Sequence, residues 1–140
     1  MAELTPEVRA FLLHGTRTGK LATVRPDGRP HVVPIWFALD EGALLFTTWH
    51  TTVKATNIRS NPHVSLCIDD ENPPFAYAML EGTAVLIDDQ EQLKLCATRI
   101  AARYMGPDLA EEYGNRNAVP GELVVRVTIN KVIFKDKVAN

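Results

Sequence analysis

The residues from Phe46 to Asn61 combine hydroxyl groups with a lysine in a pattern that suits a phosphate group. A predicted strand ends at Thr48, a loop with Thr51 and Thr52 follows, and a short predicted helix carries Lys54 in its first turn. Hydroxyls, free backbone N–H groups at a helix start and an ammonium group together form a typical phosphate site. Thr51 and Thr52 suit helix capping equally well, with Lys54 in solvent. The segment alone is compatible with both interpretations.

The apolar run from Val32 to Phe37 is the second segment with a possible chemical use. It contains Pro34, which has no N–H to donate to the ladder of a central strand. Either the run lines a ligand pocket, with Trp36 as an apolar wall, or Pro34 lies in an ordinary edge strand, where proline is usual.

Other catalytic patterns are absent from the sequence. The four histidines, His14, His31, His50 and His63, stand singly on different predicted elements. There is no HExxH pair, no GxSxG elbow, no Walker A loop and no GxGxxG after a strand. The spacing therefore predicts no metal site, no catalytic triad and no nucleotide site of those kinds.

Composition narrows the class of protein. The 140 residues are 46% hydrophobic and 23% charged, which predicts one soluble globular domain over residues 1–140. Fifteen basic against seventeen acidic residues give a net charge of -2, which disfavours nucleic-acid binding. No apolar run is long enough for a membrane span, and the opening residues MAELTPEV lack a signal-peptide pattern. Cys67 and Cys96 are far apart, as expected of small core residues in a reducing compartment. We therefore expect a cytoplasmic protein.

Hydrophobic periodicity predicts the elements that position these segments. Helices are expected at 5–14, within 49–61 and over about 89–104, the last with Lys94, Arg99 and Arg103 on its outer face and a stop at Gly106-Pro107. Residues 105–121 read as a polar connection. Six strands are expected, at 20–25, 31–39, 43–48, 63–69, 75–87 and 122–135.

Two details refine the predicted strands. Gly82 marks a bulge or tight corner, and the last strand points Leu123, Val125, Val127 and Ile129 inward and Val124 outward. Six strands joined mostly by turns favour an antiparallel barrel, because closure removes exposed edges.

Three segments in order resemble the pyridoxamine 5'-phosphate oxidase-like split β-barrel superfamily. They are GKLATVRPDGRPHVVPIWFALDEGALLFTT, TTVKATNIRSNPHVSLCID and AYAMLEGTAVLIDD, and the likeness runs from about Phe11 to about Phe134. Within that superfamily the chain looks most like small deazaflavin (F420)-dependent oxidoreductases, the branch that includes F420H2-dependent biliverdin reductases. The resemblance implies a mainly β, six-stranded antiparallel split barrel with a few short helices. It also implies a homodimer with two cofactor sites along the dimer seam.

The resemblance assigns roles to residues of this chain. Lys54 matches the basic residue that holds the cofactor phosphate, and Thr48, Thr51 and Thr52 match the hydroxyl-bearing loop around it. Val33, Pro34, Ile35 and Trp36 match the strand along which the ring lies, and Met79 matches a residue on the neighbouring strand. Arg59 matches a basic position that is either phosphate-directed or structural.

Departures from the family pattern shape the expected function. The chain lacks the Arg-x-(Val/Met)-Leu-Leu-Lys run and the C-terminal Arg-Leu-x-Pro signature of true pyridoxamine phosphate oxidases. Vitamin B6 oxidation is therefore not expected, and the missing FMN-specific run favours F420 over FMN.

The expected reaction is hydride transfer from reduced F420 to a small conjugated acceptor, a biliverdin-like tetrapyrrole or a quinone. Such chemistry belongs to the cofactor and requires no acid–base dyad, which agrees with a sequence that shows none. Solvent, His31 or Tyr77 is the expected proton donor. The alternatives are an FMN-binding oxidase or reductase of the same fold and a cofactor-binding module without turnover.

Overall fold

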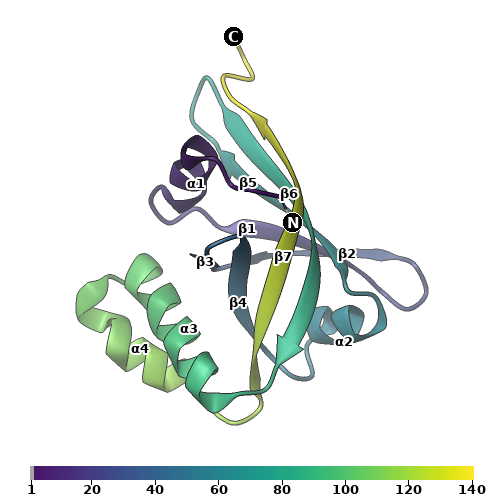
Figure 1. Ribbon diagram of the computed structural model, residues 1–140, viewed down its shortest axis with the longest axis vertical. Helices are drawn as coiled ribbons and strands as arrows, with labels where there is room; N and C mark the ends of the chain where they lie inside the picture. The colour runs from purple at the N-terminus through teal and green to yellow at the C-terminus, as the bar shows by residue number, and fades with distance from the viewer. Residues whose placement is uncertain (1) are drawn as a thin grey trace.

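Seven strands make one antiparallel sheet in the computed structural model, which describes residues 2–140 (Figure 1). The strands are β1 (Gly19–Val24), β2 (Pro30–Ile35), β3 (Ala38–Asp40), β4 (Ala43–Trp49), β5 (His63–Asp70), β6 (Ala76–Ile87) and β7 (Glu122–Lys135). Their order across the sheet is β2-β1-β5-β6-β7-β4-β3. The predicted mainly β, antiparallel architecture is confirmed, with one strand more than the six expected.

The extra strand arises because the predicted strand 31–39 is divided in two. β2 pairs with β1 at one edge of the sheet, and β3 pairs with residues 43–45 of β4 at the other edge. Trp36 and Phe37 join these edges, so the sheet closes on itself through the chain rather than through a ladder. β2 is consequently an edge strand, and Pro34 lies where a missing N–H breaks no central ladder.

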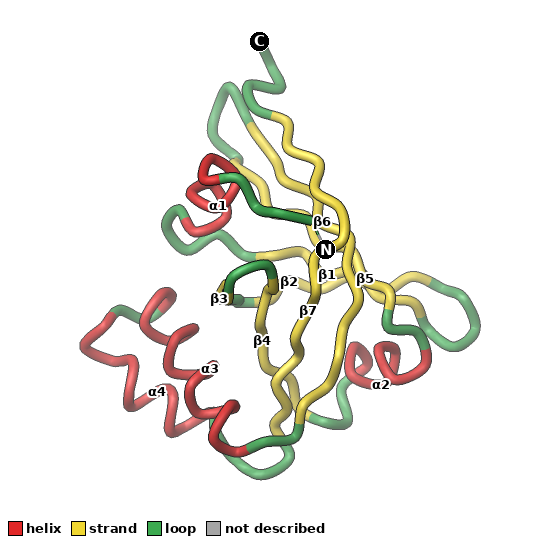
Figure 2. The backbone as a smooth tube through the Cα atoms, viewed as in Figure 1, coloured by secondary structure: helices red, strands yellow, loops and turns green. Residues whose placement is uncertain are grey.

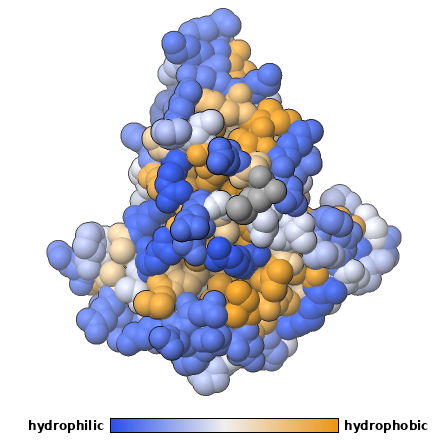
Figure 3. All heavy atoms as spheres, viewed as in Figure 1, coloured by the Kyte–Doolittle hydropathy of each residue, from blue (hydrophilic) through white to orange (hydrophobic). Residues whose placement is uncertain are grey.

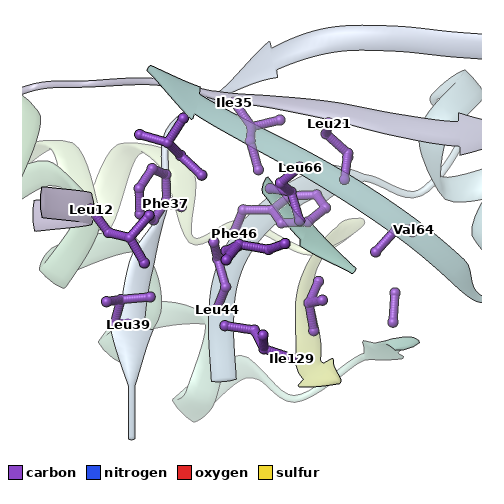
Figure 4. Packing of buried hydrophobic residues seen from close by; sticks show 14 of the residues in the cluster. Leu12, Leu21, Ile35, Phe37, Leu39, Leu44, Phe46, Val64, Leu66 and Ile129 are labelled. Atoms are coloured by element: carbon purple, nitrogen blue, oxygen red, sulfur yellow. The ribbon is translucent and has the colours of Figure 1, made fainter. Parts of the chain in front are cut away.

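The core fills the inside of this curved sheet. Figure 4 shows side chains from α1 (Pro6–Leu13), β1, β2, β4, β5 and β7 pointing toward one another. The fully buried members include Leu12, Leu21, Phe37, Leu44, Phe46, Leu66 and Ile129.

A second, smaller apolar cluster forms where α3 (Gln90–Tyr104) covers the sheet, and it contains Leu93, Cys96 and Val124. The outward placement predicted for Val124 is wrong, because α3 buries that face of β7. Cys96 is a core residue as expected, whereas Cys67 is only half-buried.

The helices lie at the rim of the barrel (Figure 2). α1 is capped by Thr5 and α3 by Asp89. A short 3-10 turn, η1 (Pro107–Leu109), and a further helix, α4 (Ala110–Asn117), occupy the stretch expected to be a polar connection. α4 escapes prediction because its sequence is largely polar. It packs on α3 through Gly114, where a Cβ would overlap Thr98. No helix within residues 2–140 has the length and apolar character needed to cross a membrane.

Helix α2 (Val53–Ser60) is fixed to the sheet by a buried polar contact. The Asn57 side-chain amide donates to the hydroxyl of Thr23 on β1 over 3.0 Å, and both residues are about 1% exposed. α2 therefore lies under the β1–β2 hairpin, apart from α3 and α4 (Figure 1).

The bulge predicted at Gly82 is confirmed. The β6–β7 register shifts between Glu81 and Gly82, and a Cβ on Gly82 would overlap the backbone carbonyl of Thr128 and the side chain of Val127.

Apolar side chains also reach the surface of the molecule. Figure 3 shows them on one outer face, between hydrophilic ones.

We expect Gly82→Ala to lower the free energy of unfolding by about 1–3 kcal/mol, because β6 and β7 must move apart to admit the methyl group. Urea unfolding measures the loss. Ser65→Ala, a half-buried change on the adjacent strand β5, serves as the control and should alter stability by less than about 0.5 kcal/mol. Equal stability of the two variants would contradict the close approach at the bulge.

We expect Asn57→Leu to destabilise the fold by about 1–3 kcal/mol, because it leaves the buried Thr23 hydroxyl without its partner. Adding Thr23→Val should recover part of the loss, since both ends of the hydrogen bond are then apolar. Urea unfolding of the two single variants and the double variant measures the coupling. Strictly additive losses would show that the two side chains act independently.

Candidate functional site

The loop between β4 and α2 is held by its own threonines. Thr52 caps α2, because its Oγ1 accepts the N–H of Ala55 over 3.2 Å. The same hydroxyl donates to the carbonyl of Trp49 over 3.1 Å, so the 2.7 Å contact with Thr48 is made by the Thr48 proton. The capping interpretation is thus correct for Thr52. Thr48 and Thr52 shape the loop and have already used their hydroxyl protons inside it.

Other groups of this loop remain free to bind an anion. The Thr51 side chain is exposed, and the N–H groups of Val53 and Lys54 have no acceptor within the described residues. These two N–H groups belong to the first turn of α2, where the helix dipole also favours negative charge.

Lys54 is half-buried, and its ammonium group forms no ion pair with any residue in 2–140. Burial lowers the pKa of Lys54 below the ordinary lysine value, and the negative charge of Glu122 partly opposes this shift. Burial also raises the pKa of the Glu122 carboxyl, and the side chain of Thr47 and the charge of Lys54 partly oppose this shift. A partly desolvated cation in the same helical turn as free N–H donors is a donor set that fits a phosphate.

Hydrogen bonds with Arg59 and Gly121, which lie beyond the loop, hold the β4–α2 loop in place. The Arg59 guanidinium donates to the carbonyl of His50 over 2.8 Å. The backbone N–H of His50 donates to the carbonyl of Gly121 over 2.9 Å, and its ring Nδ1 lies 3.0 Å from the same oxygen. Arg59 therefore has a structural role in holding the loop. Its remaining N–H groups are exposed, so the phosphate-directed role stays a prediction.

Strand β2, which is predicted to lie along a cofactor ring, would present mainly backbone groups to that ring. Val33 is half-buried and Ile35 is buried in the core, whereas Pro34 and Trp36 are exposed. Because β2 is an edge strand, its outer side has no strand partner within residues 2–140. A flat ring placed there would meet the free edge of β2 and Pro34 rather than the Ile35 side chain.

The fold places α2, the helix that carries Lys54, near the His31 end of β2. Asn57, one helical turn after Lys54, is bonded to Thr23, and Thr23 stands opposite His31 of β2 in the ladder. The ring of His31 is half-buried, and its Nδ1 is buried with no hydrogen-bond partner among the described residues. An orphaned buried nitrogen at this position is a group that a bound ligand can satisfy.

Met79 and Tyr77 are not brought to this strand. Both lie on β6, and β1 and β5 separate β6 from β2. Three strand spacings amount to roughly 14 Å. The expectation that the strand of Met79 neighbours β2 is wrong within one chain, because strand order follows long-range pairing that local sequence does not encode.

Sequence reasoning missed the long-range contacts of four residues. Asn57 reads as an ordinary polar helix residue, and Tyr104 reads as one more apolar position of α3. Arg99 and Arg103, expected on the outer face of α3, turn toward the sheet instead. Arg99 donates to the carbonyl of Leu39, and Arg103 donates to the carbonyl of Phe37 over 3.0 Å.

Known proteins share this sequence pattern and this fold. The sequence profile of the pyridoxamine 5'-phosphate oxidase family matches residues 4–136. A conserved hypothetical protein from Mycobacterium tuberculosis is 27% identical, with a TM-score of 0.83 over 96% of this chain and 86% of its own. A protein named F420 reductase is 29% identical, with a TM-score of 0.70 over 92% of this chain and 98% of its own.

A more distant structure shows the fold alone. The heme storage protein HutZ from Vibrio cholerae is 19% identical, with a TM-score of 0.72 over 94% of each chain. Proteins whose names indicate different functions therefore share this barrel. Since the family profile spans nearly the whole chain and the sheet closes as the resemblance predicts, the chain belongs to the pyridoxamine 5'-phosphate oxidase family, with its split-barrel fold.

Proposed function

We propose that this chain is an F420H2-dependent reductase that acts on a small conjugated acceptor, such as a biliverdin-like tetrapyrrole or a quinone. The observation that carries the proposal is the half-buried Lys54 ammonium at the start of α2, which has no ionic partner within residues 2–140. The 29% identity with a protein named F420 reductase supports the choice of cofactor.

The residues of this chain bind and orient the cofactor. Lys54, the Thr51 hydroxyl and the first N–H groups of α2 hold the phosphate. The edge of β2 from Val33 to Ile35 lies along the ring, and Trp36 follows directly after that edge, beyond the ring. Reduced F420, when bound, supplies a hydride from ring C5 to the acceptor, which also takes up one proton.

His31 is the better placed of the two expected proton donors. It lies on β2 itself, and its buried Nδ1 lacks a partner in the described part of the chain. Tyr77 lies three strands away, on β6. Solvent remains the alternative source of the proton.

We also propose that the sites form at the seam of a homodimer. The ladder registers place Pro34, Lys20, Cys67, Met79 and Ile133 in one row across the outer face of the sheet. Cys67, Met79 and Ile133 are only half-buried, so this row offers apolar surface to a second copy. Met79 would then serve the site from across the seam.

The deciding experiment compares F420 and FMN on protein produced in a host without F420. We expect a colourless protein that binds F420 more tightly than FMN by fluorescence titration, and that oxidises reduced F420 with menadione or biliverdin as acceptor. A yellow protein whose FMN is not displaced by F420 would identify an FMN flavoprotein instead. Tight F420 binding without turnover of either acceptor would identify a cofactor-binding module.

We expect Lys54→Ala to weaken F420 binding by about 1.5–3 kcal/mol, roughly 10- to 150-fold in Kd, because it removes a charged hydrogen bond to the phosphate. Lys94→Ala, which removes an exposed lysine on α3, is the matched control and should leave Kd unchanged. Unchanged affinity in the Lys54 variant would refute the phosphate assignment.

The same lysine predicts how F420 affinity depends on pH. The charged form of Lys54 binds the anion, so affinity is retained below its pKa and falls as the pH rises through it. Because burial lowers the pKa of Lys54, the fall should begin at a lower pH than for an ordinary lysine. Lys54→Arg keeps its charge at alkaline pH and should flatten the profile. Equal slopes for both proteins in titrations at rising pH would assign the dependence to another group.

A further inference from the structure

The indole of Trp36 is backed by a parallel aromatic ring. Its centroid lies 4.9 Å from that of Tyr104, with an angle of 2° between the ring planes. A parallel stack covers one face of an indole only, and Trp36 remains 45% exposed. The structure thus presents a large aromatic surface to solvent in a defined orientation.

Tyr104 is fixed without the help of Trp36. Its hydroxyl donates to the carbonyl of Arg17 over 2.8 Å and accepts the N–H of Phe37 over 3.3 Å. The neighbouring Arg103 guanidinium donates to Phe37 and to Leu12, and it lies 4.8 Å from the centre of the Tyr104 ring. These contacts fasten the end of α3 to the break between β2 and β3. The Trp36 side chain, by contrast, contributes little to this junction, because the buried groups are already paired.

Trp36 also lies where a second planar molecule would have to bind. It follows β2 directly, two residues and roughly 7 Å along the chain from Pro34. A rigid aromatic surface binds flat conjugated molecules well, since little conformational freedom is lost on stacking. Tyr104 occupies one side of the indole, so stacking is open from the other side only.

We propose that Trp36 is the stacking surface for a planar conjugated acceptor, and that Tyr104 is the positioning residue that sets the plane of the indole. This inference rests on the proposed function, because the acceptor must lie beside the reduced cofactor. The acceptor gains a hydride at a conjugated double bond and one proton from His31 or from solvent, and leaves as its dihydro form while the cofactor is oxidised.

Binding is tested first by fluorescence. Trp49→Phe leaves Trp36 as the only tryptophan, since the chain has two. Menadione is the probe, and we expect saturable quenching of Trp36 that an equal concentration of acrylamide does not reproduce. Saturable menadione binding, measured by calorimetry, with unchanged Trp36 fluorescence would overturn the proposal.

Kinetics then separate stacking from folding. We expect Trp36→Leu to raise the KM for menadione at least tenfold, with less than a twofold change in the Kd of F420, and Trp36→Phe to restore most of the loss. Tyr104→Leu should raise the same KM by about three- to tenfold and increase the mobility of Trp36 in fluorescence anisotropy. Tyr104→Phe, which keeps the ring, should lie close to the parent protein.

The outcomes distinguish this inference from the proposed function. An unchanged KM in Trp36→Leu, with F420 binding and turnover intact, overturns the stacking site and leaves the proposed function standing. Saturable quenching of Trp36 by menadione in a protein that does not bind F420 supports the stacking site and refutes the proposed function. A change of oligomeric state in Trp36→Leu, measured by sedimentation, would show that a second copy covers the indole and would overturn the proposal.

Discussion

The barrel depends on how the chain is held where it passes from one edge of the sheet to the other. At Trp36 and Phe37 the strand ladder stops, and buried backbone groups there must find other partners. Tyr104 and Arg103 of α3 supply them, binding the N–H and the carbonyl of Phe37. Arg103 also binds the carbonyl of Leu12 at the end of α1. One helix end therefore fastens α1, β2 and β3 around a single buried phenyl ring.

This arrangement explains why the candidate site lies at an open edge. Because the chain itself closes the barrel, β2 needs no further strand and keeps its outer side free. The pair formed by Asn57 and Thr23 then docks α2 beneath the same hairpin. Hydrogen bonds hold both ends of β2, those of Tyr104 and Arg103 at one end and that of Asn57 with Thr23 at the other. The outer edge of β2 therefore stays unpaired, and the half-buried Lys54 lies on the helix docked beneath the hairpin. The stability of the fold and the availability of the site come from the same contacts.

Local periodicity predicted what depends on neighbouring residues. Alternation identified the strands, and the capping residues Thr5, Thr52 and Asp89 stand at the starts of their helices. The break after Ile35 was not predictable in this way, because residues 32–39 are apolar almost throughout and periodicity does not show where a pairing partner changes. The prediction missed α4 for the opposite reason, because its sequence is mostly polar.

The residues of the candidate site, like the elements of the fold, were predictable only where neighbouring residues signal their role. Lys54 stood out because its neighbours signal a helix start, whereas Asn57 makes its contact with a residue 34 positions away. Likewise, the strand of Met79 does not neighbour β2 within one chain, because strand order is a property of the whole sheet. Arg103 looked like a surface residue since nothing in its helix indicates the carbonyl groups that it binds. Long-range polar contacts are the part of this protein that the sequence alone did not reveal.

The partly desolvated lysine links binding to stability. A cation removed from water without a close counter-ion costs free energy in the unbound protein, as the lowered pKa of Lys54 indicates. Glu122 offsets only part of that cost, because its own carboxyl is half-buried and its pKa is raised. An anionic ligand bound at Lys54 would supply the missing charge and so offset that cost on binding. A ligand that binds only the folded chain must in turn stabilise it.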